Sequence, residues 1–299
     1  MSGPSNLLKV LACWLAFSST ASICRGQVAE EATQLKERLA TITRGASSAD
    51  RASSIASLLD LMKVEYQSEP FDEGGKSGKN LMVDLGDESK PQLLIGAHFD
   101  QVKVGNGVVD NAGGCSLMLE LIERFNAKPL ENHCLRFAFF DLEEAGLLGS
   151  TAYVKSLTDE SKPAGFINID IFGYGDTLWM MSPSPESKLP ASFVKACKAS
   201  ELGIEVSPMK QYPPADHVPF VKAGITTIAI ALIDNPEIQL VKNAISGKRG
   251  EFPPILQTIH TPDDTMEKID STQCAKATPT VVEAIRIFDR AIANSDATE

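Results

Sequence analysis

Apolar residues form four short continuous runs in the middle of the chain, and these runs give the first picture of the fold. They lie at 93–97, 135–140, 166–169 and 226–232. Segments with helical spacing follow them, near 112–127, 146–156, 189–201 and 271–293. Strands that are apolar throughout are typical of a sheet covered on both faces, and their alternation with helices indicates parallel neighbours. The pattern predicts an α/β fold with a largely parallel central sheet.

The chain before these strands has a different pattern. Two amphipathic segments at 29–43 and 49–62 predict helices, which we interpret as a packing layer rather than part of a functional site. Short β-like runs at 64–66 and 81–85 follow, separated by a glycine-rich turn at 74–78. No internal repeat or linker divides the remainder of the sequence, which indicates one domain.

The first residues have the layout of a secretory signal peptide. Lys9 precedes an apolar run at 10–17, and small residues occupy 18–22. The run is much shorter than the roughly 20 residues of a membrane-spanning helix. We therefore interpret 1–26 as a signal peptide rather than a buried helix, and expect a periplasmic or secreted protein with no membrane association after cleavage. Residues 27–299 would then form a single domain.

Composition narrows the range of partners. The net charge of −11 and the pI near 5.0 would repel phosphates, so nucleic acid and anionic membranes are excluded. The six cysteines are widely and irregularly spaced, which is not a disulfide framework. Cys115 should begin a helix and Cys134 the following strand, which places them too far apart for a disulfide. We expect mostly buried thiols.

Polar residues directly follow several of the predicted strands. His98 and Asp100 follow the first, residues 141–144 the second, and Asp170 closes the third. In open parallel sheets, ligands bind beyond the carboxyl ends of the strands, because the loops there converge on one crevice. These residues are therefore the first candidates for a functional site.

His98 and Asp110 suit a metal centre, although each also has a structural interpretation. A neutral imidazole is a good zinc ligand, and Asp100, two residues on, is placed to accept the other ring N–H. Asp110 stands in a small-residue segment at a predicted helix start, where an acidic N-cap is common. The functional alternative is a carboxylate that bridges two metals about 3.5–4 Å apart.

The carboxylates at the end of the second strand are harder to explain structurally. Asp141, Glu143 and Glu144 would repel each other without a cation, so a positive charge is expected among them. Adjacent side chains point in different directions. Glu144 is therefore a candidate metal ligand and Glu143 a candidate general base facing the attacking water, whereas Asp141 is interpreted as structural.

The remaining candidates are ambiguous when taken singly. Asp170 alone reads as a turn or cap residue, and His260 lies in a loop rich in turn formers, beside further carboxylates. Asp216 and His217 are candidates for substrate binding, with a scaffold role equally compatible for His217. His133, at the start of a strand, is interpreted as structural.

The order and surroundings of these residues resemble the co-catalytic zinc aminopeptidases, whose relatives include glutamate carboxypeptidases and glutaminyl cyclases. The resemblance runs from about Leu93 to Thr265 and includes five separate motifs in the family's order. One small departure is Ala215 before Asp216 and His217, where the family often has Ser, which bears only on pocket detail.

The resemblance implies a three-layer α/β sandwich of the zinc exopeptidase type around a mixed, mostly parallel sheet of about eight strands. It further implies a cis peptide after Asp110. It assigns His98 and Asp170 to one zinc ion, Glu144 and His260 to the other, Asp110 as the bridge and Glu143 as the general base.

The preferred function is thus a metallo-aminopeptidase acting on peptides or small dipeptide-like substrates with two zinc ions. The first alternative is a glutaminyl cyclase, which shares much of the ligand set but uses a single zinc. A second is a non-catalytic binding protein on the same fold. A third is a carboxypeptidase, which would need a basic group such as Lys248 or Arg249 for the substrate carboxylate, in a predicted loop at 234–258 that shapes the pocket.

Overall fold

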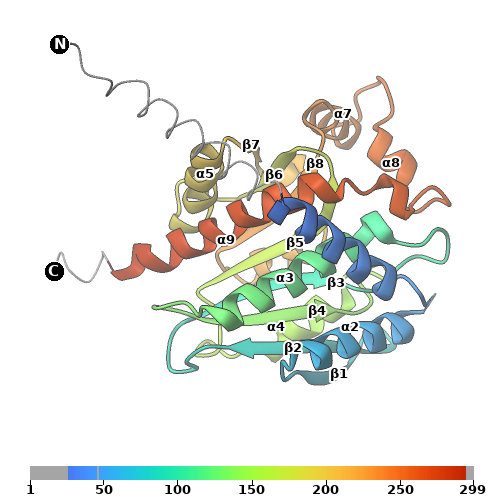
Figure 1. Cartoon of the computed structure of the whole chain (residues 1–299). Helices are drawn as coiled ribbons and strands as arrows, with labels where there is room; N and C mark the ends of the chain where they lie inside the picture. The colour runs from blue at the N-terminus through green and yellow to red at the C-terminus, as the bar shows by residue number, and fades with distance from the viewer. Residues whose placement is uncertain (1–25, 46, 294–299) are drawn as a thin grey trace, which may run out of the picture.

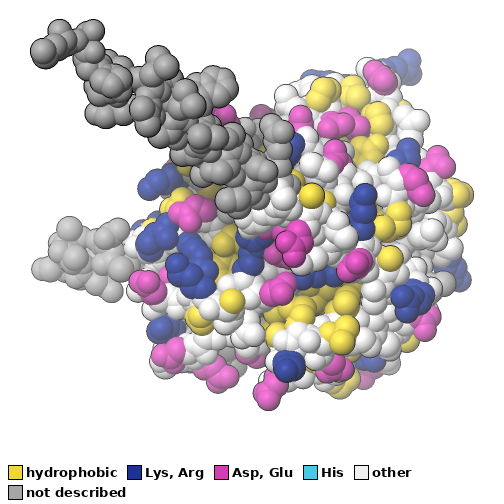
Figure 2. Space-filling view, in the orientation of Figure 1, with side chains coloured by type: hydrophobic (Ala, Val, Ile, Leu, Met, Phe, Trp, Pro, Cys, Tyr) yellow, Lys and Arg dark blue, Asp and Glu magenta, His cyan; other side chains and the backbone are white. Residues whose placement is uncertain are grey.

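The computed structural model describes residues 26–45 and 47–293. The predicted signal peptide lies outside these residues except for Gly26. Within the described chain, no helix has both the length and the apolar character needed to cross a bilayer. Lys and Arg side chains lie interspersed with Asp and Glu on the face shown in Figure 2.

A single mixed sheet of eight strands forms the centre of the molecule. Its order is β1-β2-β4-β3-β5-β8-β6-β7. The three central pairs, β4 with β3, β3 with β5 and β5 with β8, are parallel, as is β6 with β7; the other three pairs are antiparallel. The strands are β1 Gln67–Glu73, β2 Lys76–Leu85, β3 Gln92–His98, β4 Cys134–Phe140, β5 Gly165–Tyr174, β6 Thr177–Met181, β7 Gly203–Ser207 and β8 Thr227–Ile233.

Helices cover both faces of this sheet, which confirms the predicted sandwich. A helix over residues 26–42 packs with α2, α3, α5 and α9 in the larger apolar core, and α4 and α6 enclose the smaller one on the other face. Figure 1 shows α3 and α9 crossing in front of the strands. The helices are α2 Ser48–Met62, α3 Gly113–Ala127, α4 Leu148–Ser156, α5 Lys188–Ser200, α6 His217–Lys222, α7 Asn235–Ile245, α8 Pro254–Thr258 and α9 Ser271–Ala293, with short turns η1 Val108–Ala112, η2 Met209–Gln211 and η3 Met266–Lys268.

Several predicted elements differ from the structure at the edges of the sheet. The predicted run at 64–66 is not a strand; β1 begins at Gln67, and its polar sequence reflects an edge strand that is exposed along much of its length. The glycine turn contracts to residues 74–75, which makes β1 and β2 a tight hairpin. Strands β6 and β7 had not been predicted.

The segment 234–258 was predicted as a loop, and this was wrong. It contains α7 and α8. Pro236 stands in the first turn of α7, where a missing N–H costs nothing, and Ile238 and Val241 form the buried side of that helix. The prolines therefore mark helix starts rather than irregular chain.

Candidate metal centre

Five segments far apart in the sequence bring the predicted ligands together at the carboxyl edge of the sheet. His98 ends β3, Asp110 lies in η1, Glu144 follows β4, Asp170 lies within β5, and His260 follows α8. The side chains of the first four are largely buried, whereas His260 is 50% exposed. The centre is therefore open to solvent on the side of the His260 loop.

These five residues form two groups of three that share Asp110. In the first trio, His98 Nε2 lies 3.1 Å from Asp110 Oδ1 and 3.5 Å from Asp170 Oδ1. In the second trio, His260 Nε2 lies 3.0 Å from Asp110 Oδ2 and 3.1 Å from Glu144 Oε2. Each trio offers three ligand atoms within 4.8 Å of one another. Asp110 thus presents one oxygen to each group, as a bridging carboxylate must.

The donor set and its unmet polar atoms fit divalent metal ions. Glu144 Oε1 is buried without a hydrogen-bond partner, and Asp170 Oδ1 makes no well-aligned hydrogen bond. Buried carboxylate oxygens left in this way are costly unless a cation neutralises them. Two imidazoles and three carboxylates are ligands that zinc accepts.

The electrostatics of the two histidines also indicate a place for cations. Burial alone would lower the pKa of His98, but the surrounding carboxylates, Glu143 foremost, raise it well above its ordinary value. Hydrogen bonds with Asp110 and Glu144 raise the pKa of His260 to about 10. In both cases the carboxylates favour positive charge on the imidazole, and a metal ion would supply that charge in place of the proton.

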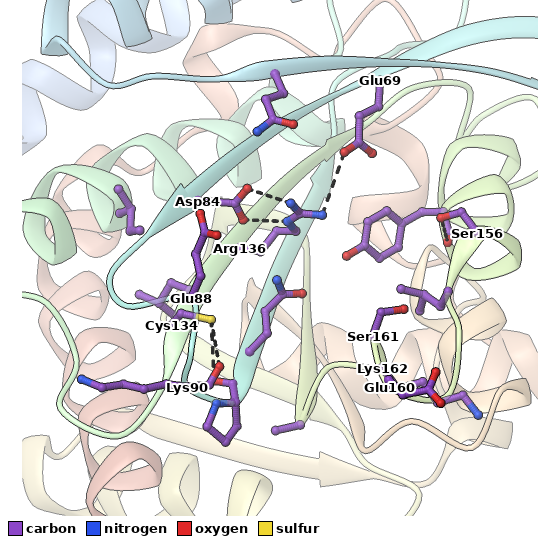
Figure 3. Close-up of a pocket in the computed structure, with 18 residues that line it drawn as sticks. Glu69, Asp84, Glu88, Lys90, Cys134, Arg136, Ser156, Glu160, Ser161 and Lys162 are labelled. Carbon is purple, nitrogen blue, oxygen red and sulfur yellow. Dashed lines mark hydrogen bonds and ion pairs between the residues drawn. The ribbon is translucent and has the colours of Figure 1, made fainter.

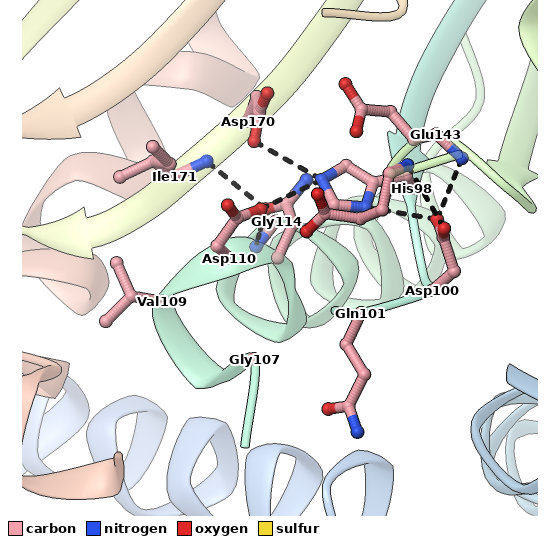
Figure 4. A network of polar contacts seen from close by, with 12 residues as sticks. His98, Asp100, Gln101, Gly107, Val109, Asp110, Gly114, Glu143, Asp170 and Ile171 are labelled. Carbon is pink, nitrogen blue, oxygen red and sulfur yellow. Dashed lines mark hydrogen bonds and ion pairs between the residues drawn. The ribbon is translucent and has the colours of Figure 1, made fainter. Parts of the chain in front are cut away.

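Asp100 links the two halves of the centre (Figure 4). Its Oδ1 lies 3.4 Å from His98 Nδ1. The same carboxylate accepts hydrogen bonds from the backbone N–H groups of Glu143, at 3.0 Å, and Glu144, at 3.1 Å. Asp100 therefore orients one candidate ligand and fixes the turn that carries another, which is the supporting role expected of it.

Glu143 lies on this turn with its carboxyl group facing the centre. Burial raises the pKa of Glu143 to about 9, with further contributions from Asp216, Asp170 and Asp110 that His98 partly offsets. Leu142, just before it, has a left-handed backbone with φ of 58°. A cation nearby would favour the carboxylate form of Glu143, which is the form a general base requires.

Left-handed backbone is concentrated around the candidate ligands. Six non-glycine residues of the described chain have positive φ, and Leu142, Ile171 and His260 are three of them. Such conformations are uncommon outside glycine and persist where surrounding contacts impose them. The peptide between Asp110 and Asn111 is cis, as the resemblance implied.

Three residues that support the centre were not identified as functional from the sequence. The carboxylate of Asp264 accepts hydrogen bonds from the backbone of Val108 and Val109, at 2.9 and 2.7 Å, and so holds the turn that carries Asp110. Asn111 joins this turn to β5. Arg51 donates to main-chain carbonyls behind the turn.

Arg51 had a signal that could have revealed it. In α2 it lies on the buried side together with Ala52, Ile55 and Leu59, and its side chain is fully buried. A charged residue on the apolar side of an amphipathic helix needs buried partners. The first helices are therefore more than a packing layer.

The structure gives the other predicted residues distinct places. Asp216 and His217 lie at the start of α6 and are buried; burial raises the pKa of Asp216 to about 7 and lowers that of His217 to about 4. Their part in substrate binding remains a prediction. His133 Nδ1 lies 2.9 Å from Asp289 Oδ1, far from the centre, which supports a structural role.

Asp141 and the cysteines match their structural interpretation. The carboxylate of Asp141 accepts from the backbone N–H groups of Lys79 and Leu142. The four cysteines of the described residues are buried free thiols: Cys115, Cys134, Cys197 and Cys274.

Asp170 does not close its strand as predicted. Strand β5 continues to Tyr174, and its register against β8 shifts between Ile169 and Phe172. The residue nevertheless reaches the centre: it lies two positions beyond Asn168, as His98 lies two beyond its partner Gly96, so the two side chains leave the same face of the sheet.

Known proteins resemble this chain in both sequence and fold. The profile of peptidase family M28 matches residues 80–285. Aminopeptidase YwaD of Bacillus subtilis (strain 168) is 28% identical over 198 residues, covering 64% of this chain and 40% of that protein. The solved structure of BSAP, a zinc aminopeptidase from Bacillus subtilis, aligns with a TM-score of 0.58 at 25% identity, covering 71% of this chain and 50% of that chain.

A glutaminyl cyclase of Bacteroides thetaiotaomicron bound to N-acetylhistamine aligns with a TM-score of 0.68 at 20% identity, covering 85% of this chain and 97% of that chain. This likeness shows the fold alone. The chain spans half or less of the length of the two aminopeptidases. The family match nevertheless covers more than half of this chain and includes all five candidate ligands, so the protein belongs to peptidase family M28.

Proposed function

We propose that this protein is an aminopeptidase with two zinc ions in its active site. One ion would be held by the first trio, His98, Asp110 and Asp170, and the other by the second trio, Asp110, Glu144 and His260. The observation that carries this proposal is the position of Asp110, whose two oxygens face separate imidazoles at 3.1 and 3.0 Å. A single-metal centre has no need of a shared carboxylate.

Glu143 is the proposed proton carrier of the reaction. Bound zinc would polarise the scissile carbonyl and lower the pKa of water, as metal ions do in hydrolases. Glu143 takes the proton of the attacking water and afterwards gives it to the departing amine. Asp100 fixes the turn that carries Glu143, because it accepts from the Glu143 backbone N–H at 3.0 Å.

The centre suits a substrate with a free α-amine. The two zinc ions would neutralise the carboxylates of Asp110, Glu144 and Asp170, and the amine would approach one ion or a nearby carboxylate. Lys248, Arg249 and their neighbours at the end of α7 are exposed to solvent. They do not form the buried basic pocket that a carboxypeptidase would need.

An apolar hollow of about 70 Å³ beside the first trio would accept the side chain of the N-terminal residue. Asp170, Ile171, Trp179 and Leu256 are among the residues that line it. Burial of an apolar side chain contributes about 25 cal/mol per Å² removed from water. We therefore expect preference for Leu- or Met-like residues over charged ones.

Mass spectrometry of peptide products tests the proposal. The purified full chain would be incubated with peptides that start with Leu, acetyl-Leu, Lys or Gln, with and without a chelator. We expect chelator-sensitive release of the first residue from free N-termini, with Leu fastest. Ammonia loss confined to the Gln peptide would replace the proposal with a cyclase, and the absence of any product from zinc-loaded protein would contradict both.

A further inference from the structure

Asp170 lies in a β-bulge rather than in regular strand. On the β8 side, Ile169 pairs with Ile230 and Phe172 with Leu232, so two residues of β5 stand opposite one residue of β8. Ile171 has φ of 59°. Bulges of this kind leave one residue without a ladder partner and bend the strand locally. At this bulge Asp170 Oδ1 lies 3.5 Å from His98 Nε2.

The side chain of Asn111 spans this bulge on the other edge of β5. Its Nδ2 donates to the carbonyl of Ile169 at 2.9 Å, and its Oδ1 accepts from the N–H of Ile171 at 3.2 Å. The regular ladder between β3 and β5 ends just before, where Gly96 pairs with Asn168. A carboxamide carries the same donor and acceptor as a peptide group. Asn111 therefore takes the place of a strand residue where the pairing of β3 with β5 has ended.

The start of α3 is shaped to keep Asn111 in this position. The backbone N–H of Gly114 donates to Asn111 Oδ1 at 3.0 Å. A Cβ atom at Gly114 would lie 2.3 Å from that oxygen, and one at Gly113 would lie 2.1 Å from the carbonyl oxygen of Phe172. The lack of a side chain at Gly113 thus allows α3 to approach β5, and the lack of one at Gly114 leaves room for the Asn111 carboxamide.

We propose that Asn111 is the positioning residue of the first trio and sets the metal affinity of that trio separately from the second. It does so by holding the main chain on both sides of Asp170, at Ile169 and Ile171. The second trio has other supports: Asp100 holds the Glu144 N–H, and the backbone of Asp264 ties the His260 loop to Asn106. This inference rests on the proposed two-zinc centre.

The test is a competition titration of zinc against a chromogenic chelator, which yields a dissociation constant for each ion. Wild type, N111A and N111D would be compared, with N132A as control, since Asn132 also donates to a backbone carbonyl but at Asp289, away from the centre. N111D has nearly the volume of asparagine and keeps the acceptor, but loses the donor to Ile169. Any effect that both variants show is therefore not due to the cavity that Asn111→Ala would create.

We expect both Asn111 variants to bind one ion about 10–100-fold more weakly than wild type, the usual cost of removing a supporting group of a metal ligand. The other ion should keep its affinity. The retained ion should be the one held by the second trio. Its dissociation constant should therefore equal that of the ion retained by Asp170→Ala, and the double variant N111A/His260→Ala should lose it. N132A should bind both ions as wild type does.

The possible failures are distinguishable. Wild type that binds fewer than two ions would overturn the two-zinc proposal together with this inference. Two wild-type ions with unchanged constants in N111A and N111D would overturn the inference alone. Equal weakening of both ions would also overturn it, because a general loss of structure has no preference for one trio; the melting temperature of the metal-free variants identifies that case.

Discussion

The two ends of the parallel strands both carry clustered charged side chains, but the charges are matched at one end and unmatched at the other. At the starts of β3, β4 and β5 lies a hollow of about 780 Å³ (Figure 3). Within it, Arg136 makes a two-pronged ion pair with Asp84, at 2.6 and 2.7 Å, and lies 3.9 Å from Glu69. The guanidinium of Arg136 and the carboxylate of Asp84 therefore neutralise each other.

At the carboxyl ends of the same strands, carboxylates gather around two imidazoles without an equal number of permanent cations. The result is a buried oxygen of Glu144 without a partner and strongly raised pKa values for His98 and Glu143. The larger hollow is therefore the poorer candidate for a site. Unmatched charge, which requires a ligand, is more informative here than the size of a cavity.

The strongest test of this comparison removes the proposed base. Glu143→Gln should lower kcat by about 10²–10⁴-fold, the typical contribution of a positioned general base. The variant should still bind zinc, since Glu143 belongs to neither trio. Kinetics on a Leu peptide measures kcat, and zinc analysis measures metal content. If kcat does not change, Glu143 is not a catalytic residue.

The next effect concerns the turn that carries the shared ligand. Asp264→Ala removes the acceptor for the N–H groups of Val108 and Val109, so Asp110 loses its fixed position. Because Asp110 serves both trios, we expect both zinc affinities to fall, by about 10–100-fold. The zinc titration checks this, and loss of only one ion would contradict the bridging position of Asp110.

A smaller effect, on stability, is expected behind the centre. Arg51 donates to the carbonyls of Phe99 and Gly107 at 3.2 and 3.0 Å. Arg51→Met leaves buried acceptors unpaired, at about 1–3 kcal/mol each, so the free energy of unfolding should fall by about 2–4 kcal/mol. Urea denaturation of the metal-free protein measures it.

Arg38 provides the matched control for Arg51. It pairs with Glu120 and Glu123 and keeps 13% of its side-chain surface exposed, so Arg38→Met should cost less than Arg51→Met, about 1 kcal/mol. An equal loss of unfolding free energy in the two variants would mean that the buried position of Arg51 does not increase its contribution to stability.

The sequence allowed the central sheet and the candidate ligands to be predicted because both depend on local signals. Continuous apolar runs identify buried strands, and polar residues directly after β3 and β4 identify the crevice. The ligand assignments drew on resemblance to a family, since Asp170 and His260 read as ordinary loop residues when taken alone.

Long-range contacts set the features that could not be predicted. The bulge at Asp170 depends on Asn111, about 60 residues earlier in the chain, and the turn at Asp110 depends on Asp264, about 150 residues later. No local pattern encodes either pairing. The polar strand β1 is recognisable only through its partner β2, because its alternation is between exposed and partly exposed residues rather than between polar and apolar ones.

The smallest effect is expected at the matched end of the strands. Arg136→Met breaks the ion pair with Asp84, both partners of which keep 23% of their side-chain surface exposed. The free energy of unfolding should fall by about 0–1 kcal/mol, as for other solvent-accessible pairs, and kcat and zinc affinity should not change. Urea denaturation and peptide kinetics on the same preparation measure both. A loss of activity as large as that of Glu143→Gln would mean that the 780 Å³ hollow takes part in the reaction. Paired charges would then be no sign that a region lacks function.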